Sequence, residues 1–473
     1  MRLAATSLFV IILLALVSLI ATMNGCGGEL KGNHILAGKF QHVVIIFQEN
    51  RTPDNLFQDP ALIRAGADIA NSGINSKRQK IPLSPLPLAT NFDLDHQHEA
   101  FVSMFDNGKM DGADKVKVLC AAKNCPPRNP QFSYVDPADV QPYFRMAEQY
   151  TFGDRMFQTN QGPSFPAHQF IISGTSALTA NSTSFVADNG YGISGPVLTG
   201  CISPPNETVD VVNAFGKEVA PVYPCTEHPA LTDELNGRGI SWRYYTPTAG
   251  TLWTAPNAIQ HMCGPNAAPP DATACIGADW KDHVVIYAGS TTNPAPVLTD
   301  IANGQLPQVS WVIPSGASSD HAGNVRTNEG PSWVAAVVNA IGNSSYWENT
   351  AIIVTWDDWG GWYDHVPPFK IVNDGKSWGS GYVYGFRVPL IVISRYARSG
   401  YISHVNHDFG SILHFLEETF NLPSLGYADA YADDLSDCFN FQQTPLAFKI
   451  IDAPLSPSHF MNDSIVDTDP DDD

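Results

Sequence analysis

The sequence has little positive charge. Its 473 residues include 26 lysines and arginines against 47 aspartates and glutamates, so the formal net charge is -21. A surface of this charge repels phosphate backbones and anionic bilayers, and we therefore expect no nucleic-acid partner. A zwitterionic headgroup or a small phosphorylated substrate is still compatible with the charge.

Long apolar runs are missing after the N-terminus. The one run of this kind covers residues 8–20, follows Arg2 and is followed by small and polar residues. A charged start with a short apolar stretch is typical of a secretory signal, whereas a membrane-spanning helix needs about 20 apolar residues. We therefore expect residues 1–25 to be a signal peptide, the protein to be secreted or periplasmic, and no integral membrane span to follow signal cleavage.

Cys26 offers a second interpretation of the N-terminus. It directly follows Gly25 at the end of the expected signal, where a cysteine can carry a lipid anchor. Met23 and Asn24 are poor residues for a lipid-attachment site. Lipoprotein anchoring through Cys26 is therefore an alternative that its neighbours disfavour.

Cysteine motifs that bind zinc are also missing. The sequence has eight cysteines but no Cys-x-x-Cys and no tight cluster of Cys and His, so the spacing gives no support for a zinc site. Three close pairs lie in Pro-, Gly- and Asn-rich stretches, which in an oxidising compartment is typical of disulfides that close local loops. The sequence alone leaves the connectivity open. The close pairs are Cys120 and Cys125, Cys201 and Cys225, and Cys263 and Cys275.

Buried strands and helices alternate along the chain. Short runs rich in Val, Ile and aromatic residues predict strands, and periodic apolar residues predict helices between them. Few strands alternate polar and apolar residues, which suits a sheet covered on both faces. We expect an α/β fold with a central, mostly parallel sheet flanked by helices. The main predicted strands cover residues 42–47, 308–314, 351–356 and 389–394, and the main helices 142–150, 167–177, 333–341 and 407–420.

Two segments differ from this pattern. Residues 181–305 are rich in Pro, Asn, Thr and Gly, carry four cysteines and contain one clear strand at 240–245. We expect this segment to be an insertion or a lid over the sheet. Residues 451–473 end in a run of aspartates and are expected to form an acidic tail.

Acidic residues follow two of the predicted strands. One strand ends in Glu49 and Asn50, a second ends in Asp357 and Asp358, and a third ends near Asp320. If these strands are parallel neighbours, the acids meet at one edge of the sheet, where α/β proteins bind ligands. Several buried carboxylates need a cation among them, and oxygen ligands indicate a divalent metal. Each acid taken alone is more simply explained as a residue of a surface turn or as the cap of a helix.

Ser164 adds a nucleophile to this set. It lies just before Pro166, which suits the first turn of a helix, so its hydroxyl is expected near the positive end of the helix dipole. The simpler alternative is an ordinary serine cap, worth about 1 kcal/mol. His96 and His321 are candidate proton donors, because imidazole titrates near neutral pH. The alternatives for this role are His98, His168 and His365.

Five short blocks follow one another between residue 42 and about residue 420. They are the stretch 42–57 with Gln48-Glu49-Asn50-Arg51, then Asp93-x-x-His96, Gly162-Pro163-Ser164-x-Pro166, the stretch 356–368, and the stretch 407–413. In this order the blocks resemble the bacterial phosphoesterase family. That family contains non-zinc phosphatidylcholine phospholipases C and a respiratory-burst-inhibiting acid phosphatase.

The resemblance implies an alkaline-phosphatase-like fold, a catalytic domain over residues 39–450, and hydrolysis of phosphate mono- or diesters. The implied partner is a phosphate ester such as a phospholipid headgroup, and the implied cofactor is a divalent metal ion of open identity. Matched position by position, the nucleophile is Ser164, the metal and phosphate pocket is formed by Glu49, Asn50, Asp357 and Asp358, and the catalytic histidines are His96 and His321.

Two positions depart from the family pattern. The second acid of the later block is commonly Glu and here is Asp358, which is one methylene shorter. The next position is often small or His and here is Trp359. These differences leave the metal geometry and the substrate pocket open.

Two other functions are compatible with the acids. A sulfatase-type hydrolase would share these acids, but it requires the motif Cys/Ser-x-Pro-x-Arg. The run that begins at Ser164 has the proline of this motif but ends in His168 where the motif has Arg, which disfavours a sulfatase. A non-catalytic exported binding protein could use the acids to hold a structural cation. Such a protein would be stabilised by metal without turning over an ester.

Overall fold

The structure is a computed structural model that describes residues 35–120, 125–126, 128–190, 199–323, 329–368 and 384–462. The expected signal peptide, Cys26 and residues 463–473 of the expected tail lie outside this part. At the centre is an eight-stranded sheet with the order β14-β13-β15-β1-β16-β17-β8-β18. Its strands are β1 (His42–Gln48), β8 (Thr151–Gly153), β13 (Trp242–Thr246), β14 (Val284–Ile286), β15 (Val309–Val312), β16 (Thr350–Trp356), β17 (Leu390–Ile393) and β18 (Tyr401–Ser403).

The sheet is mostly parallel, as predicted. Only β17 runs against its neighbours β16 and β8. The central strands β1 and β16 pair in parallel over seven residues, with Ile45 opposite Ile353, and β15 pairs with β1 on its other side. All residues of β16, and all of β1 after His42, are buried, because helices cover both faces of these apolar runs.

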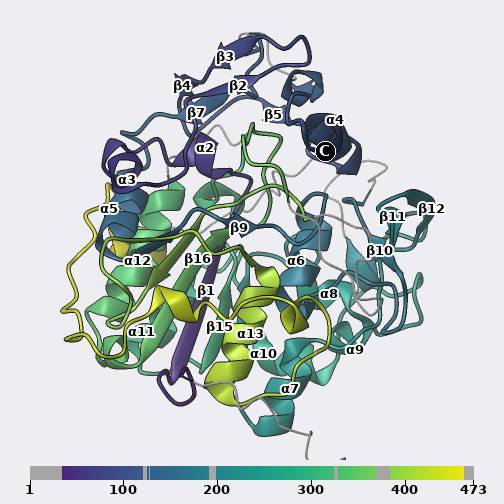
Figure 1. Ribbon diagram of the computed structural model, residues 1–473. Helices are drawn as coiled ribbons and strands as arrows, with labels where there is room; N and C mark the ends of the chain where they lie inside the picture. Colours follow the sequence, from purple (N-terminus) through teal and green to yellow (C-terminus); the bar gives the residue numbers. More distant parts are fainter. Residues whose placement is uncertain are drawn as a thin grey trace, which may run out of the picture.

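The covering helices form two layers (Figure 1). Helices α5, α11 and α12 pack together on one side of β1, β15 and β16, and α6 and α13 pack together on the other. The helix predicted at 167–177 begins earlier, at Ser164, and ends where Gly174 takes the left-handed conformation. These helices are α5 (Gln141–Gln149), α6 (Ser164–Ser173), α11 (Pro296–Ala302), α12 (Glu329–Gly342) and α13 (Phe409–Phe420).

The segment 181–305 is only partly an insertion. It forms a separate three-stranded antiparallel sheet and several short helices, but β13 and β14 also belong to it and extend the central sheet beside β15. The segment that was expected to lie over the sheet therefore also supplies two strands at one side of it, β13 and β14. The remaining elements of the segment are β10 (Ser184–Val186), β11 (Val209–Asn213), β12 (Glu218–Val222), α7 (Leu231–Arg238), α8 (Ala255–Ala258), α9 (Gln260–Cys263) and α10 (Ala278–His283).

A group of small elements lies beyond the carboxyl ends of the central strands, at the top of Figure 1. It has its own apolar cluster, in which Phe101 of α4 packs against Phe386 and Trp359. The group thus covers the edge where the acids were expected. Its elements are α2 (Pro53–Leu56), α3 (Pro60–Ala65), β2 (Ser72–Ile74), β3 (Lys80–Pro82), β4 (Ser84–Leu86), β5 (Asp93–Leu94), α4 (His98–Phe105), β6 (Val118–Leu119) and β7 (Ser133–Val135).

The C-terminal segment packs on the helix layer. Helix α14 (Pro457–Asn462) lies within the expected tail, yet its Phe460 is buried and its ring centroid lies 5.3 Å from that of Trp333 in α12. The described beginning of the expected acidic tail is therefore part of the folded domain.

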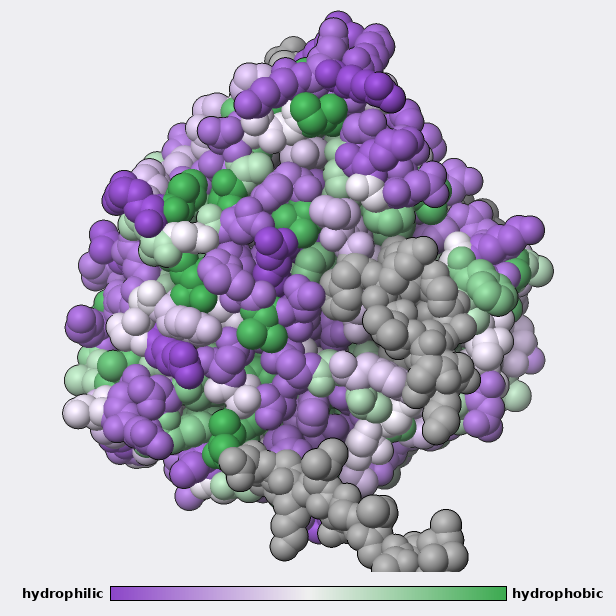
Figure 2. Space-filling model, in the orientation of Figure 1, coloured by the Kyte–Doolittle hydropathy of each residue, from purple (hydrophilic) through white to green (hydrophobic). Residues whose placement is uncertain are grey.

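The cysteines pair as their spacing suggested. Disulfides join Cys120 to Cys125, Cys201 to Cys225 and Cys263 to Cys275. Within the described residues, Cys438 alone stays a thiol, and it is buried. Among the helices that the structure describes, none is both long and apolar enough to cross a membrane. The face shown in Figure 2 is mostly hydrophilic, with apolar residues scattered over it.

We predict that Ile45→Ala lowers the free energy of unfolding by about 2–5 kcal/mol, because it leaves a cavity at the buried face of β1, where a helix layer covers the sheet. The matched control is Ile63→Ala in α3, where the side chain is 39% exposed, with an expected change within about 0.5 kcal/mol. Denaturant unfolding monitored by tryptophan fluorescence measures both. Equal losses for the two variants would contradict the central position of β1.

Candidate active site

Two adjacent strand ends form the floor of the candidate site. Strand β1 continues into Glu49 and Asn50, and its neighbour β16 continues into Asp357 and Asp358. The backbone N–H of Asp357 donates to the carbonyl of Gln48 at 3.0 Å, and that of Asn50 donates to Oδ1 of Asp357 at 3.1 Å. The four residues expected to form the metal pocket therefore lie in two bonded turns at one edge of the sheet.

The turns are close because two residues have a left-handed backbone. Asn50 has φ 60° and Gly360 has φ 61°. Asparagine tolerates this conformation better than most residues, and glycine has no steric penalty there. A Cβ on Gly360 would lie 2.5 Å from that of Asn50. The N–H of Gly360 also donates to Oδ1 of Asp358 at 2.7 Å, which fixes that carboxylate.

Ser164 is the first residue of α6 and does not cap the helix with its side chain. Its Oγ lies 3.3 Å from Oδ2 of Asp358 and 3.5 Å from Oε2 of Glu49, so its single proton can be donated to either carboxylate. All three side chains are fully buried. The structure therefore brings the expected nucleophile to the expected acids, at the positive end of a helix dipole.

His168 joins the acids, a position the sequence left as one alternative among three. It follows Ser164 by one helical turn, so both side chains lie on the same face of α6. Its Nε2 lies 3.5 Å from Oε1 of Glu49 and 3.8 Å from Oδ2 of Asp357, and its Nδ1 lies 3.3 Å from the Tyr244 hydroxyl. The spacing of four residues from the serine was the available signal.

The buried acids fit a divalent cation. Ligand atoms of Glu49, His168 and Asp357 lie within 4.8 Å of one another. Among the described residues, no hydrogen-bond partner meets Oδ2 of Asp357 or Oδ1 of Asn50, and both atoms are buried. Buried carboxylates are stable as anions only when paired, hydrogen-bonded or bound to metal. Glu49, Asp357 and His168, with Asn50 and Asp358 beside them, are therefore the residues that would hold a metal ion.

The two expected catalytic histidines lie next to each other above this floor. The ring centroids of His96 and His321 are 5.9 Å apart, and Nδ2 of Asn50 lies 3.2 Å from Nε2 of His96. Each Nδ1 faces a backbone carbonyl, that of Leu94 at 2.8 Å and that of Ala322 at 2.5 Å. A carbonyl only accepts, so each Nδ1 carries hydrogen and Nε2 is the nitrogen that exchanges a proton.

Arg51, directly after Asn50, supports the segment that carries His321. It is fully buried, and its guanidinium donates to the backbone carbonyl of Asp320 at 2.5 and 2.9 Å while lying over the Trp362 ring. Burial lowers the pKa of Arg51 to about 10, although the Asp320 carboxylate raises it. Burial also raises the pKa of Asp320 to about 6, and Arg51 opposes this shift.

A second polar cluster surrounds His365. Its Nδ1 lies 2.7 Å from Asp54 and its Nε2 lies 3.0 Å from Asp68, while the buried Arg387 bonds Asp54 at 3.3 Å and Asp364 at 3.0 Å. The group Asp54, Asp364 and His365 has metal-ligand spacing. The Arg387 guanidinium already supplies a cation there, so we interpret the cluster as an ion-pair network. His98, the third alternative, faces Glu218 at 2.8 Å.

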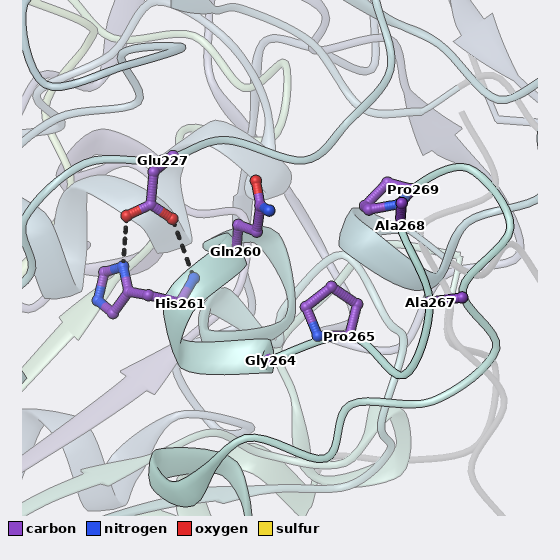
Figure 3. A pocket seen from close by; sticks show the side chains of 8 residues that line it. All are labelled: Glu227, Gln260, His261, Gly264, Pro265, Ala267, Ala268 and Pro269. Atoms are coloured by element: carbon purple, nitrogen blue, oxygen red, sulfur yellow. Dashed lines mark hydrogen bonds and ion pairs between the residues drawn. The ribbon is translucent and has the colours of Figure 1, made fainter.

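A shallow surface pocket lies elsewhere, around α9 and the loop after it (Figure 3). It has a volume of about 440 Å³, and in it His261 meets Glu227 at 3.0 Å. Burial lowers the pKa of His261, but hydrogen bonds and charge from Asp233 and Glu227 raise it to about 9. Its lining contains none of the residues expected in the active site.

Comparisons with known proteins match most of the chain. The model of the Phosphoesterase family matches residues 40–423. Phospholipase C B of Mycobacterium tuberculosis is 26% identical over 450 residues, covering 86% of this chain and 78% of that protein. The non-hemolytic phospholipase C of Pseudomonas aeruginosa is 24% identical, covering 85% of this chain and 57% of that protein.

Solved structures match more distantly. A protein in the alkaline phosphatase superfamily from Vibrio parahaemolyticus is 11% identical, with coverage of 85% of this chain and 70% of that chain, at a TM-score of 0.38. The α/β architecture is established by the sheet order and pairing given above.

We predict that the His365 network stabilises the fold in a pH-dependent way. Burial lowers the pKa of His365, but Asp54 and Asp364 raise it to about 9. The folded state therefore holds this proton more tightly than the unfolded chain, whose histidine pKa is about 6.5. This stabilisation is complete below the unfolded pKa and is lost as pH rises through about 9.

His365→Gln should accordingly lower the free energy of unfolding, relative to the parent protein, by more at pH 6 than at pH 10. Denaturant unfolding at both pH values measures the difference. His42→Gln is the matched control, because burial lowers the pKa of His42 and predicts the opposite trend with pH. An equal loss at both pH values in His365→Gln would contradict the network.

Proposed function

Since the chain belongs to the phosphoesterase family and is a phosphoric ester hydrolase, we propose that it acts as a phospholipase C with Ser164 as its nucleophile. The observation that carries this proposal is the position of the Ser164 hydroxyl, 3.3 Å from Asp358 and 3.5 Å from Glu49 at the start of α6. A hydroxyl beside two carboxylates has acceptors for its proton, and the helix N-terminus favours the oxygens of a phosphoryl group.

The first step is attack of Ser164 Oγ on phosphorus. The serine proton passes to Asp358 or Glu49, the new O–P bond forms, and the bond from phosphorus to the leaving alkoxide breaks. The alkoxide takes a proton from Nε2 of a protonated imidazole, either His96, which lies beside Asn50, or its neighbour His321. In a phospholipid this alkoxide belongs to diacylglycerol.

The second step restores the enzyme. The histidine that gave its proton now accepts one from water, and the hydroxide oxygen attacks phosphorus of the phosphoseryl group. The bond from phosphorus to Oγ breaks, Ser164 regains its proton from the carboxylate, and the phosphorylated headgroup leaves. Because Nδ1–H of His96 and of His321 is held by a backbone carbonyl, Nε2 is the nitrogen that exchanges the proton: the imidazolium gives it up in the first step, and the neutral imidazole accepts it in the second.

The acids beside Ser164 serve a bound divalent metal in this proposal. Glu49, Asp357 and His168 would hold it, with Asn50 and Asp358 adjacent. When bound, such an ion neutralises charge that develops on the phosphoryl oxygens and on the serine alkoxide. These five residues would thereby keep Ser164 and the substrate phosphate together at the carboxyl ends of β1 and β16.

The substrate and the compartment are inferred from the relatives and from the disulfides. Because the relatives are phospholipases C, a phospholipid is favoured over a soluble phosphate ester. The three disulfides support an oxidising compartment, and thus export of the protein. We propose a secreted or periplasmic enzyme that removes phosphorylated headgroups from phospholipids.

Ser164→Ala is expected to lower kcat for p-nitrophenylphosphorylcholine by at least about a thousandfold, as loss of a nucleophile does in other hydrolases. Ser173→Ala, at the other end of α6, is the matched control and should keep its activity. Circular dichroism and unfolding curves establish that both variants fold. Undiminished turnover by folded Ser164→Ala would exclude the serine as nucleophile, and faster turnover of a sulfate ester would exclude the substrate class.

Removal of metal is expected to abolish turnover, and a divalent ion should restore it. Asp357→Asn removes one charge without changing the side-chain volume, so it should lower the bound metal by one equivalent and kcat with it. Metal content by mass spectrometry and turnover are measured on the same samples. Full activity of a protein shown to be free of metal would contradict the role of these acids.

A further inference from the structure

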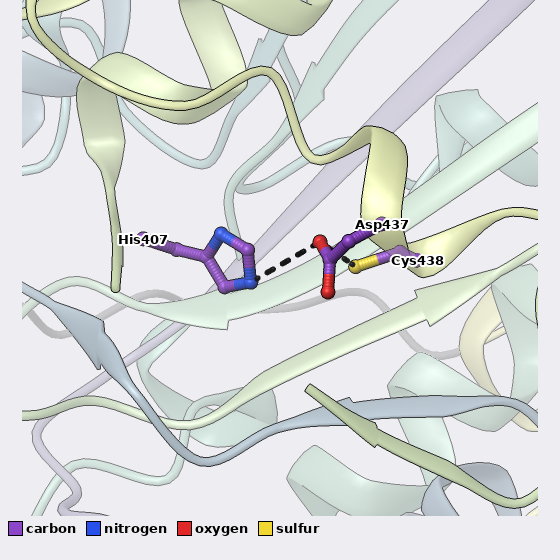
Figure 4. Close-up of side chains that lie close together, drawn as sticks. All are labelled: His407, Asp437 and Cys438. Atoms are coloured by element: carbon purple, nitrogen blue, oxygen red, sulfur yellow. Dashed lines mark hydrogen bonds and ion pairs between the residues drawn. The ribbon is translucent and has the colours of Figure 1, made fainter. Parts of the chain in front are cut away.

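A third group of ligand side chains lies away from Ser164, at the β18 edge of the central sheet. Its members are His407, from β19 (His407–Asp408), and Asp437 and Cys438, from the short helical turn η7 (Ser436–Cys438). In Figure 4 His407 points from one strand toward Asp437 and Cys438 on the facing turn. We propose that these three residues bind a structural zinc ion.

The distances from Oδ1 of Asp437 to the other two ligand atoms are close to those of a tetrahedral zinc site, and all three atoms lie within 4.8 Å of one another. Oδ1 of Asp437 lies 3.6 Å from Sγ of Cys438 and 3.7 Å from Nε2 of His407. Zinc bonds of about 2.3 Å to sulfur and about 2.1 Å to nitrogen and oxygen, at tetrahedral angles, separate S and O by about 3.6 Å and N and O by about 3.4 Å. These two distances are therefore within a few tenths of an ångström of zinc geometry.

His407 is oriented as zinc-bound histidines are. Its Nδ1 lies 2.8 Å from Oδ1 of Asp433, and Ser411 donates to the same carboxylate oxygen at 2.6 Å. The carboxylate accepts the Nδ1 hydrogen, so Nε2 is directed into the group. A carboxylate behind the imidazole is the usual second partner of a metal-binding histidine.

Asp437 is also held with one oxygen toward the group. Its Oδ2 accepts a hydrogen bond from Ser403 at 2.5 Å and one from Tyr401 at 3.5 Å, which leaves Oδ1 facing sulfur and nitrogen. Oγ of Ser403 also lies 2.9 Å from Nε2 of His407, a hydrogen bond that an ion would replace. The Asp437 side chain is 24% exposed, which gives the ion a path from solvent.

Cys438 has the properties of a ligand rather than of a disulfide partner. It is fully buried, and it is the one described cysteine outside the three disulfides. Its carbonyl accepts from Oγ of Thr151 at 2.9 Å and from the N–H of Arg398 at 2.9 Å, which fixes the backbone beside the sulfur. A mixed sulfur, nitrogen and oxygen set favours zinc over the hard cations.

The consequence of the site would be structural. It joins the segment after α13 to the edge of the central sheet, where β18 and η7 are in contact. The competing account is a network without metal in which His407 pairs with Asp433 and Asp437 and is hydrogen-bonded to Ser403. The two accounts differ in whether sulfur bonds to a metal.

Cobalt substitution separates them. The full-length protein, freed of metal by a chelator and dialysed, is titrated with Co²⁺ while absorption is recorded. We expect a thiolate-to-cobalt charge-transfer band in the near ultraviolet, displaced by Zn²⁺. The acids and histidine near Ser164 contain no sulfur, so that site cannot produce the band, and Asp357→Asn should retain it. Absence of the band in the unmodified protein would overturn the proposal.

Variants then assign the ligands. Cys438→Ala and His407→Ala should each lose the band, bind one equivalent of zinc less, and no longer gain thermal stability from added Zn²⁺. His414→Ala, a half-buried histidine that faces the Ala432 carbonyl, is the matched control and should behave as the parent protein. Retention of the band and of the metal equivalent in folded Cys438→Ala would overturn the proposal as well.

Discussion

The charge buried between the ends of β1 and β16 is the constraint on which the site depends. Glu49, Asp357 and Asp358 are all fully buried beside one serine and one histidine. Taking each charge out of water costs several kcal/mol unless it is compensated. Hydrogen bonds and a nearby cation are the means by which a folded protein compensates buried carboxylates. The backbone N–H groups of the two turns and the dipole of α6 supply part of the compensation, and we propose that a divalent ion supplies the rest.

The fold makes this concentration of charge possible. Parallel pairing of β1 with β16 brings their ends together, and the left-handed backbone at Asn50 and Gly360 allows the two turns to touch. Helix α6 places Ser164 and His168 on one face, toward the acids. The small elements after β1 then cover the edge with His96 and an aromatic cluster. Each contribution comes from a different part of the chain, which explains why the motifs are far apart in sequence.

Local patterns in the sequence predicted the main strands, the α/β class and the residues that meet at the strand ends. Apolar runs followed by acidic residues are local signals, and they were sufficient to predict these features. Other features depend on contacts between distant segments. The membership of β13 and β14 in the central sheet, and the packing of Phe460 on Trp333, have no local signature. The zinc proposal is the clearest case, because the sequence showed no Cys/His motif and the fold brings His407 to Cys438.

The stereochemical course at phosphorus tests the central claim most directly. A diester made chiral at phosphorus with sulfur is hydrolysed in ¹⁸O-labelled water, and the configuration of the thiophosphate product is determined. Attack by Ser164 followed by attack of water comprises two in-line displacements, each with inversion, so our account predicts overall retention. Overall inversion would mean that water attacks the substrate directly, and it would contradict the role of Ser164 as nucleophile.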